Sequence, residues 1–241
     1  RITRKIVEEN ISLSLKRMNV ETLDLLQFHW WDYHDANYLD ALTYLSELRD
    51  EGRIKHVALT NFNTEHLGRI ADNGIRIVSN QVQFSLVDLR PKEQMVEYCK
   101  EHNIQLLTYG TICGGLLSEK YLGQPEPRSS VLNTASLKKY KQMVDAWGGW
   151  DLFQELLHML KKIGEKHNAS IANVGTRYIL DEPMVAGVII GTRLGVTDHI
   201  ADNAHVFDFK LDNEDHELIE PILHKSHDLY RLIGDCGDEY R

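Results

Sequence analysis

Residues 23–29 read LDLLQFH and residues 56–61 read HVALTN, two short and largely apolar runs that each end in polar side chains. Between them, a helical pattern extends over about residues 38–51 and stops before Gly52. A short apolar run, a helix and a second short apolar run form the pattern of a parallel βαβ unit. This stretch decides the fold class, because the rest of the chain repeats it.

The alternation of strands and helices continues towards both ends. Further strands are predicted at residues 77–82, 104–108 and 185–190. Further helices are predicted at residues 2–18, 64–74, 92–102, 137–147, 151–167, 171–181, 196–203 and 213–225, with Thr64 as an N-cap. Residues 111–149 are punctuated by Gly and Pro, and residues 226–241 read as an irregular tail. The pattern therefore contains five strands.

Five strands fit either part of a (β/α)8 TIM-type barrel that lacks its first strands or a complete doubly wound open sheet. The open sheet is disfavoured because no glycine-rich turn follows the first strand. Polar side chains also follow all five strands, whereas a doubly wound sheet concentrates them at one crevice. The carboxyl ends of all barrel strands face one mouth. The sequence therefore predicts the barrel.

Composition excludes several classes of function. The 241 residues carry a formal net charge of −9, which disfavours nucleic acid or an anionic membrane as a partner. Cys99, Cys113 and Cys236 are too widely spaced for a disulfide framework or a zinc knuckle. No signal peptide and no membrane-length apolar run is present. A reducing cytoplasmic location is the default, and an organelle stroma fits equally.

The strand ends carry the candidate chemistry. They read His29-Trp30-Trp31, Thr60-Asn61, Gln81, Tyr109-Gly110 and Gly191-Thr192-Arg193. Side-chain amides both donate and accept, so they can bind a carboxamide. An aromatic face can stack on a flat heterocycle, and an arginine can bind a phosphate. Convergence of these groups at one mouth favours a site for a nucleotide-like cofactor.

Five motifs together resemble the aldo-keto reductases. They are DLLQFHW at 24–30, ALTNFN at 58–63, SNQVQF at 79–84, TYGTICGGLLSEKY at 108–121 and VIIGTRLGVTDHIADN at 188–203. They cover nearly the whole chain, in the order and with the spacing of that family. The resemblance implies that residues 1–241 form one partial barrel domain, from roughly the fourth strand to the C-terminal tail, with the helix before that strand.

The resemblance also assigns roles at the nicotinamide end of the site. His29 corresponds to the catalytic histidine that orients the substrate carbonyl. Thr60, Asn61 and Gln81 would hold the nicotinamide carboxamide, with Thr60 replacing the usual serine but keeping its hydroxyl. Tyr109 would stack on the nicotinamide ring. On the residues alone, His29 is equally read as a packed strand-end histidine. The less favoured alternative for Tyr109 is a core aromatic.

The remaining roles concern phosphates, adenosine and substrate. The expected set is Gly110, Gly114 and Gly115 at the pyrophosphate, Arg193 and His199 at the adenosine 2′-phosphate, Asp202 and Asn203 at adenine, and Trp30 and Trp31 at the substrate. Taken by themselves, the glycines are more often loop punctuation, and the tryptophans can be rim aromatics. His199 stands where the family commonly has arginine, which weakens the preference for NADP and leaves NAD as an alternative.

The resemblance therefore implies an NAD(P)H-dependent oxidoreductase that reduces aldehydes or ketones to alcohols. The family also uses an Asp, a Tyr and a Lys, which correspond to positions before residue 1, so we expect a fragment of a longer protein, inactive by itself. Two alternatives remain. One is a non-enzymatic cofactor-binding module, like the β subunits of voltage-gated potassium channels, and the other is an inactive remnant.

Two further sites are weighed and set aside. A metal site in HWWDYHD would use His29, Asp32, His34 and Asp35, but no further ligand is evident, so no metal is predicted. A nucleophilic Cys113 has no base at a recognisable spacing.

Overall fold

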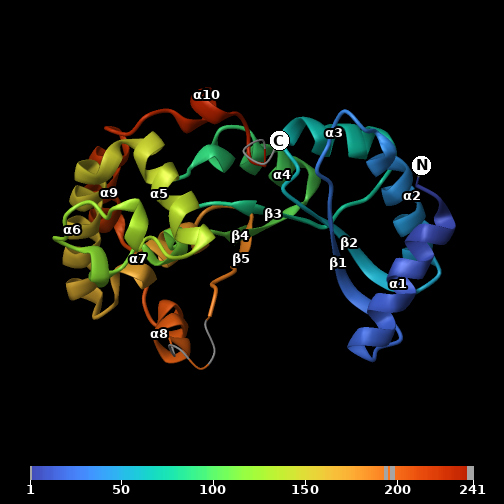
Figure 1. Ribbon diagram of the computed structural model, residues 1–241, viewed down its shortest axis with the longest axis horizontal. Helices are drawn as coiled ribbons and strands as arrows, with labels where there is room; N and C mark the ends of the chain where they lie inside the picture. The colour runs from blue at the N-terminus through green and yellow to red at the C-terminus, as the bar shows by residue number, and fades with distance from the viewer. Residues whose placement is uncertain (1, 193–194, 196–198, 238–241) are drawn as a thin grey trace.

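A single parallel sheet organises the chain in the computed structural model, which describes residues 2–192, Gly195 and residues 199–237 (Figure 1). Its strands are Leu23–His29 (β1), Ile54–Thr60 (β2), Ser79–Gln83 (β3), Gln105–Tyr109 (β4) and Val185–Val188 (β5). They lie in the order β1-β2-β3-β4-β5, so each strand pairs with its neighbour in sequence. A doubly wound sheet reverses its order at a switch point, whereas barrel strands follow one another around the axis. The sheet is therefore an arc of a (β/α)8 barrel, as predicted.

Helices alternate with these strands in the order expected of repeated βαβ units. They are Arg4–Met18 (α1), Asn37–Asp50 (α2), Thr64–Asp72 (α3), Met95–His102 (α4), Ala135–Trp147 (α5), Gly149–His167 (α6), Ile171–Leu180 (α7), Ile200–Ala204 (α8), Asn213–Leu223 (α9) and Leu229–Ile233 (α10). Most bounds agree with the predicted ranges within about three residues. Residues 196–198, which open the predicted helix 196–203, lie outside the described residues.

Three local predictions are wrong. Asn63, not Thr64, caps α3, because the Asn63 side chain accepts a hydrogen bond from the His66 amide. The helix predicted from residue 92 begins at Met95, since Arg90–Lys92 form a separate 3-10 turn that contains a proline. The tail is not irregular throughout, because it contains α10.

The two faces of the sheet differ in their surroundings. Phe28, Leu59 and Leu106 share the face that packs against the helices, and both leucines are 0% exposed. On the opposite face, Leu25 is 41% exposed and its neighbour Gln27 is also exposed. Apolar burial therefore stabilises the outer side of the arc. The inner side, where the strand-end side chains gather, stays accessible.

The C-terminal tail is fastened beside the ends of β2 and β3. Arg90 donates hydrogen bonds to the carbonyl oxygens of Gly234 (3.3 Å) and Asp235 (3.1 Å). The Asp235 carboxylate accepts a hydrogen bond from the Thr64 amide at 2.7 Å. Figure 1 shows the described part of the tail running on from α10 towards the part of the molecule that holds α3. The tail therefore braces the loop from which α3 starts.

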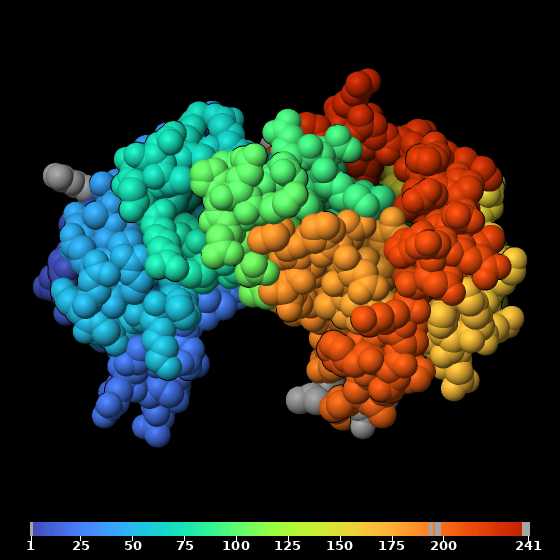
Figure 2. Space-filling model, turned by 180° about the vertical axis from the view of Figure 1, so that it is seen from behind, coloured from blue at the N-terminus to red at the C-terminus, as the bar shows by residue number. Residues whose placement is uncertain are grey.

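The segment around α8 projects from the rest of the molecule. Figure 2, which views the molecule from behind, shows this segment in orange, with a notch between it and a blue N-terminal projection. The packing that holds α8 comes from α7: Asn173 Nδ2 donates to the Asp202 backbone oxygen at 2.8 Å. The strand-end residues of β1 and the residues of α8 therefore occupy separate parts of the structure.

Candidate active site

Strand register brings three of the predicted site residues into one row. His29 pairs with Thr60, Thr60 with Gln81, and Gln81 with Leu107. Residues that pair across parallel strands point to the same face of the sheet, and this row lies on the inner face. Tyr109 lies two residues after Leu107 and so points to that face as well. A histidine, a hydroxyl, an amide and a phenol thus line one edge of the arc.

Asn61 joins this group through its side chain. The Tyr109 hydroxyl donates a hydrogen bond to Asn61 Oδ1 at 2.7 Å, and the Asn61 amide donates to the Gln81 carbonyl at 2.9 Å. Asn61 has a φ of 58°, in the left-handed region that asparagine tolerates better than most residues. Its Nδ2 makes no hydrogen bond within the described chain, so this NH2 group is available as a donor.

A lysine that the sequence analysis missed stands over the Tyr109 ring. Lys139 Nζ lies 5.3 Å from the centroid of that ring and 5.2 Å from the centroid of the Tyr140 ring. Lys139 belongs to α5, which packs on the loop after β4. The only signal for it in the sequence is a pair of lysines on a predicted helix, which is usually a solvated surface feature. Its place beside Tyr109 makes it a candidate for binding an anionic group.

The glycines after β4 divide into two kinds. A Cβ on Gly110 would lie 2.4 Å from the Tyr140 hydroxyl, and one on Gly114 would lie 2.7 Å from Ser136 Oγ. Close approach of α5 therefore accounts for both glycines without a pyrophosphate. Gly115 has a φ of 98° and no heavy atom within 4 Å of a built Cβ. Of the three, it is the one with open space where a Cβ would stand.

The two tryptophans after β1 play different parts. The Trp30 indole donates to the carbonyl oxygens of Asp32 (2.9 Å) and Asp35 (3.0 Å) and stacks on Phe28, which lies on the helix side of the sheet. The Trp31 ring lies edge-on against His29, with centroids 4.5 Å apart. Trp31 is 65% exposed. We therefore keep Trp31 as a substrate-facing candidate and assign Trp30 to holding the loop.

The residues predicted to contact adenosine lie in and just before α8, except Arg193. The Asp202 carboxylate accepts hydrogen bonds from Ser170 Oγ (3.0 Å) and Asn173 Nδ2 (3.2 Å), so it already holds α8 to α7. His199 precedes α8 as its exposed N-cap residue, and Asn203 lies within that helix. Arg193 lies outside the described residues. Among the described residues, His199, Asp202 and Asn203 therefore stay candidates for contacting adenosine, with Asp202 also holding α8 to α7.

The structure also bears on the two sites that were set aside. Cys113 is buried, and burial raises the pKa of its thiol to about 12, which keeps the sulfur protonated near neutral pH. A nucleophilic role is therefore contradicted. In the described residues, no three His, Cys, Asp or Glu side chains gather in a way that could hold a metal ion.

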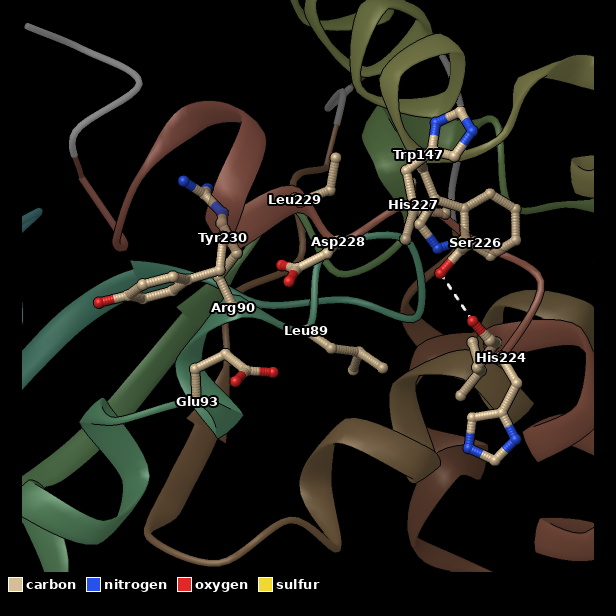
Figure 3. Close-up of a pocket in the computed structure, with 12 residues that line it drawn as sticks. Leu89, Arg90, Glu93, Trp147, His224, Ser226, His227, Asp228, Leu229 and Tyr230 are labelled. Carbon is tan, nitrogen blue, oxygen red and sulfur yellow. Dashed lines mark hydrogen bonds between the residues drawn. The ribbon is translucent and has the colours of Figure 1, made fainter.

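A cavity of about 350 Å³ lies apart from the strand-end row. Figure 3 shows that Arg90 and Glu93, the end of α5 at Trp147, and tail residues including Asp228 and Tyr230 enclose it. None of the predicted site residues lines it. The cavity is thus a consequence of how the tail crosses the loop after β3.

Comparison with known proteins gives one consistent family. The profile described as Aldo/keto reductase family matches residues 1–224. Flagellar radial spoke protein 5 of Chlamydomonas reinhardtii is 31% identical over 67% of this chain and 34% of its own length. The aldo-keto reductase YhdN of Bacillus subtilis is 26% identical over 91% of this chain and 63% of its own length. The glyoxal reductase of the same organism is 26% identical over 87% of this chain and 60% of its own length.

Solved structures agree on the fold. A glycerol dehydrogenase from Gluconobacter oxydans superposes with a TM-score of 0.75 at 22% identity, covering 96% of this chain and 66% of that one. An aldo/keto reductase from Klebsiella pneumoniae in complex with NADP and acetate superposes with a TM-score of 0.63 at 17% identity. The match covers 90% of this chain and 64% of that one. The chain spans less than two thirds of the length of each of these relatives. No helix in the described residues is long and apolar enough to cross a membrane.

Proposed function

The chain belongs to the aldo/keto reductase family, and on this premise we propose that it forms the nicotinamide side of an NAD(P)H-dependent carbonyl reductase. NADP is the cofactor and a small aldehyde or ketone the substrate. One observation carries the proposal: strand register places His29, Thr60 and Gln81 in one row on the accessible face. The Klebsiella relative solved with NADP and the relatives named glyoxal reductase and methylglyoxal reductase support the same choice.

The donor set at the strand ends fits a nicotinamide. A carboxamide needs both a donor and an acceptor from the protein, and the side-chain amides of Asn61 and Gln81 offer both. Because Tyr109 occupies Asn61 Oδ1, Asn61 binds through its Nδ2, which suits the carboxamide oxygen. Lys139 covers one face of the Tyr109 ring, so a stacked nicotinamide uses the other face.

The protein's own part in the chemistry centres on His29. Bound NADPH would supply the hydride for the carbonyl carbon. His29 lies at the carboxyl end of β1 beside Trp31, where its ring can donate a hydrogen bond to the carbonyl oxygen as negative charge develops there. Trp31 would cover the substrate on its exposed side. Such a donor orients the carbonyl and stabilises the transition state.

Binding without turnover is the second candidate function. It is favoured by the relative that is named for a flagellar radial spoke rather than for a reaction. A reducing compartment, cytosol or organelle stroma, is proposed for either function, supported by Cys99 and Cys113, which are free thiols buried in the core.

Consumption of NADPH in the presence of a small aldehyde such as methylglyoxal separates the two functions, when it is measured on a protein that also contains the segment expected to carry the family's Asp, Tyr and Lys. A reductase is expected to oxidise NADPH only when aldehyde is present, and a His29→Phe variant should lose this reaction while still binding NADPH. A chain that binds NADPH but leaves it unconsumed with a panel of small aldehydes and ketones would establish the binding module instead. The absorbance of reduced nicotinamide, followed with and without aldehyde, measures the outcome.

A further inference from the structure

The loop that carries Asn61 is held by two side chains from elsewhere in the fold, Tyr33 of the loop after β1 and Asn80 of β3. The Tyr33 hydroxyl donates to the Asn61 carbonyl oxygen at 2.9 Å and accepts from the Asn63 amide at 3.3 Å. The buried Asn80 side chain accepts from the Phe62 amide at 3.4 Å and donates to the Phe62 carbonyl at 2.8 Å. Each of these side chains therefore bonds one backbone donor and one backbone acceptor of residues 61–63.

The remaining backbone groups of these residues are also bonded. The Asn61 amide donates to the Gln81 carbonyl at 2.9 Å, and the Asn63 carbonyl accepts from the Leu67 amide at 3.1 Å. All six backbone N–H and C=O groups of residues 61–63 thus have partners, so the loop has one well-defined conformation. That conformation places Asn61 in the left-handed region, which is unfavourable for a residue with a Cβ unless its surroundings hold it there.

Tyr33 itself is fixed by its ring. The ring stacks on His66 with centroids 3.6 Å apart and planes 15° apart, and it packs against Phe62 at 5.5 Å. His66 is in turn bonded to Asn63 Oδ1 through Nδ1 at 2.6 Å. The phenol is therefore aimed at the backbone of the loop and is engaged on both its donor and its acceptor side. This geometry suits a support for Asn61 and excludes Tyr33 as the proton donor to a substrate.

We propose that Tyr33 is a positioning residue for the nicotinamide end of the site: its hydroxyl holds Asn61 in the left-handed conformation from which the Asn61 side chain meets Tyr109 and binds the cofactor carboxamide. The inference rests on the proposed function, because the carboxamide is the ligand of that function. Loss of the hydrogen bond from the Tyr33 hydroxyl to the Asn61 carbonyl oxygen is expected to shift Asn61 away from its binding conformation. The adenosine end, at α8, makes no use of Tyr33.

Tyr33→Phe tests the inference, because it removes the hydroxyl and keeps the stacked ring. The variant is expected to bind NADPH about five- to tenfold more weakly, the effect of about one hydrogen bond. Adenosine 2′,5′-bisphosphate, which lacks the nicotinamide, should bind with unchanged affinity. In hydrogen–deuterium exchange, the Asn63 amide should exchange faster in the variant, because it loses its acceptor. Tyr38→Phe is the matched control, since Tyr38 packs on Phe62 and His66 but makes no hydrogen bond to residues 61–63.

The outcomes separate the inference from the function on which it rests. NADPH bound equally well by the wild type and by Tyr33→Phe would overturn the positioning role alone. Equal weakening of NADPH and adenosine 2′,5′-bisphosphate would also overturn it, because that result indicates a general loss of structure. A wild-type chain that binds adenosine 2′,5′-bisphosphate and NADPH with the same affinity, or binds neither, would overturn the proposed nicotinamide site and the inference with it.

Discussion

Replacing Arg90 with methionine is expected to lower the free energy of unfolding by about 3–5 kcal/mol, the usual cost of removing one partner of a buried ion pair. Arg90 and Asp88 are each 1% exposed at the side chain, and the guanidinium bonds both carboxylate oxygens at 2.8 and 2.7 Å. Without it, the buried Asp88 charge keeps no cationic partner among those described and is left with the Gln83 side-chain amide at 2.7 Å and the backbone amide of residue 90 at 3.3 Å. The tail also loses its bonds from Arg90. Urea unfolding followed by circular dichroism measures the change.

Two control variants isolate the buried charge as the cause. Arg90→Met combined with Asp88→Leu should be less destabilised than Arg90→Met alone, because no unpaired charge remains. Arg231→Met removes an arginine that is 87% exposed and pairs with Asp228 at 3.2 Å, so its effect should stay within about 0.5 kcal/mol. If the double variant is as unstable as the single one, the unpaired carboxylate is not the cause.

Replacing Tyr109 with alanine is expected to weaken NADPH binding about ten- to a hundredfold. The substitution removes the ring on which the nicotinamide stacks and the hydroxyl that holds Asn61 Oδ1 at 2.7 Å. Tyr109→Phe keeps the ring and loses only the hydroxyl, so it should weaken binding by about three- to tenfold. Fluorescence titration of the three proteins with NADPH gives the affinities.

A ligand without nicotinamide serves as the control for Tyr109. Adenosine 2′,5′-bisphosphate should bind the wild type, Tyr109→Phe and Tyr109→Ala equally, because Tyr109 lies at the strand-end row and not at α8. Wild-type affinity for NADPH in Tyr109→Ala would remove Tyr109 from the site. Equal losses for both ligands would indicate that the substitution disturbs the loop after β4 and the packing of Tyr140 on Gly110.

Local periodicity was sufficient to predict the row of site residues. His29, Thr60, Gln81 and Tyr109 each follow a recognisable apolar strand, and parallel strands bring their carboxyl ends together. The fold class and the gathering of these side chains at one edge of the sheet were thus readable from the sequence, and their role at the nicotinamide stays a prediction.

Features that depend on contacts between distant parts of the chain were not readable. Gly110 and Gly114 were expected at a pyrophosphate, which stays a prediction, but the close approach of Tyr140 and Ser136 of α5 to these two glycines was not predicted. The tail was expected to be irregular, yet Arg90 binds it across a separation of 144 residues. Hydrophobic periodicity does not predict such contacts, because each of them depends on a single side chain that meets a distant backbone group. Tyr33 was missed as a support of Asn61 for the same reason.

The most direct test of the nicotinamide site is a titration of the wild-type chain with NADPH, followed by tryptophan fluorescence. Because Trp31 lies against His29 at the strand ends, we expect saturable quenching that a Trp31→Phe variant largely loses and a Trp150→Phe variant keeps. NADPH should also bind more tightly than adenosine 2′,5′-bisphosphate, since the nicotinamide adds contacts. Absence of quenching at millimolar NADPH would contradict the claim that these strand ends bind the cofactor.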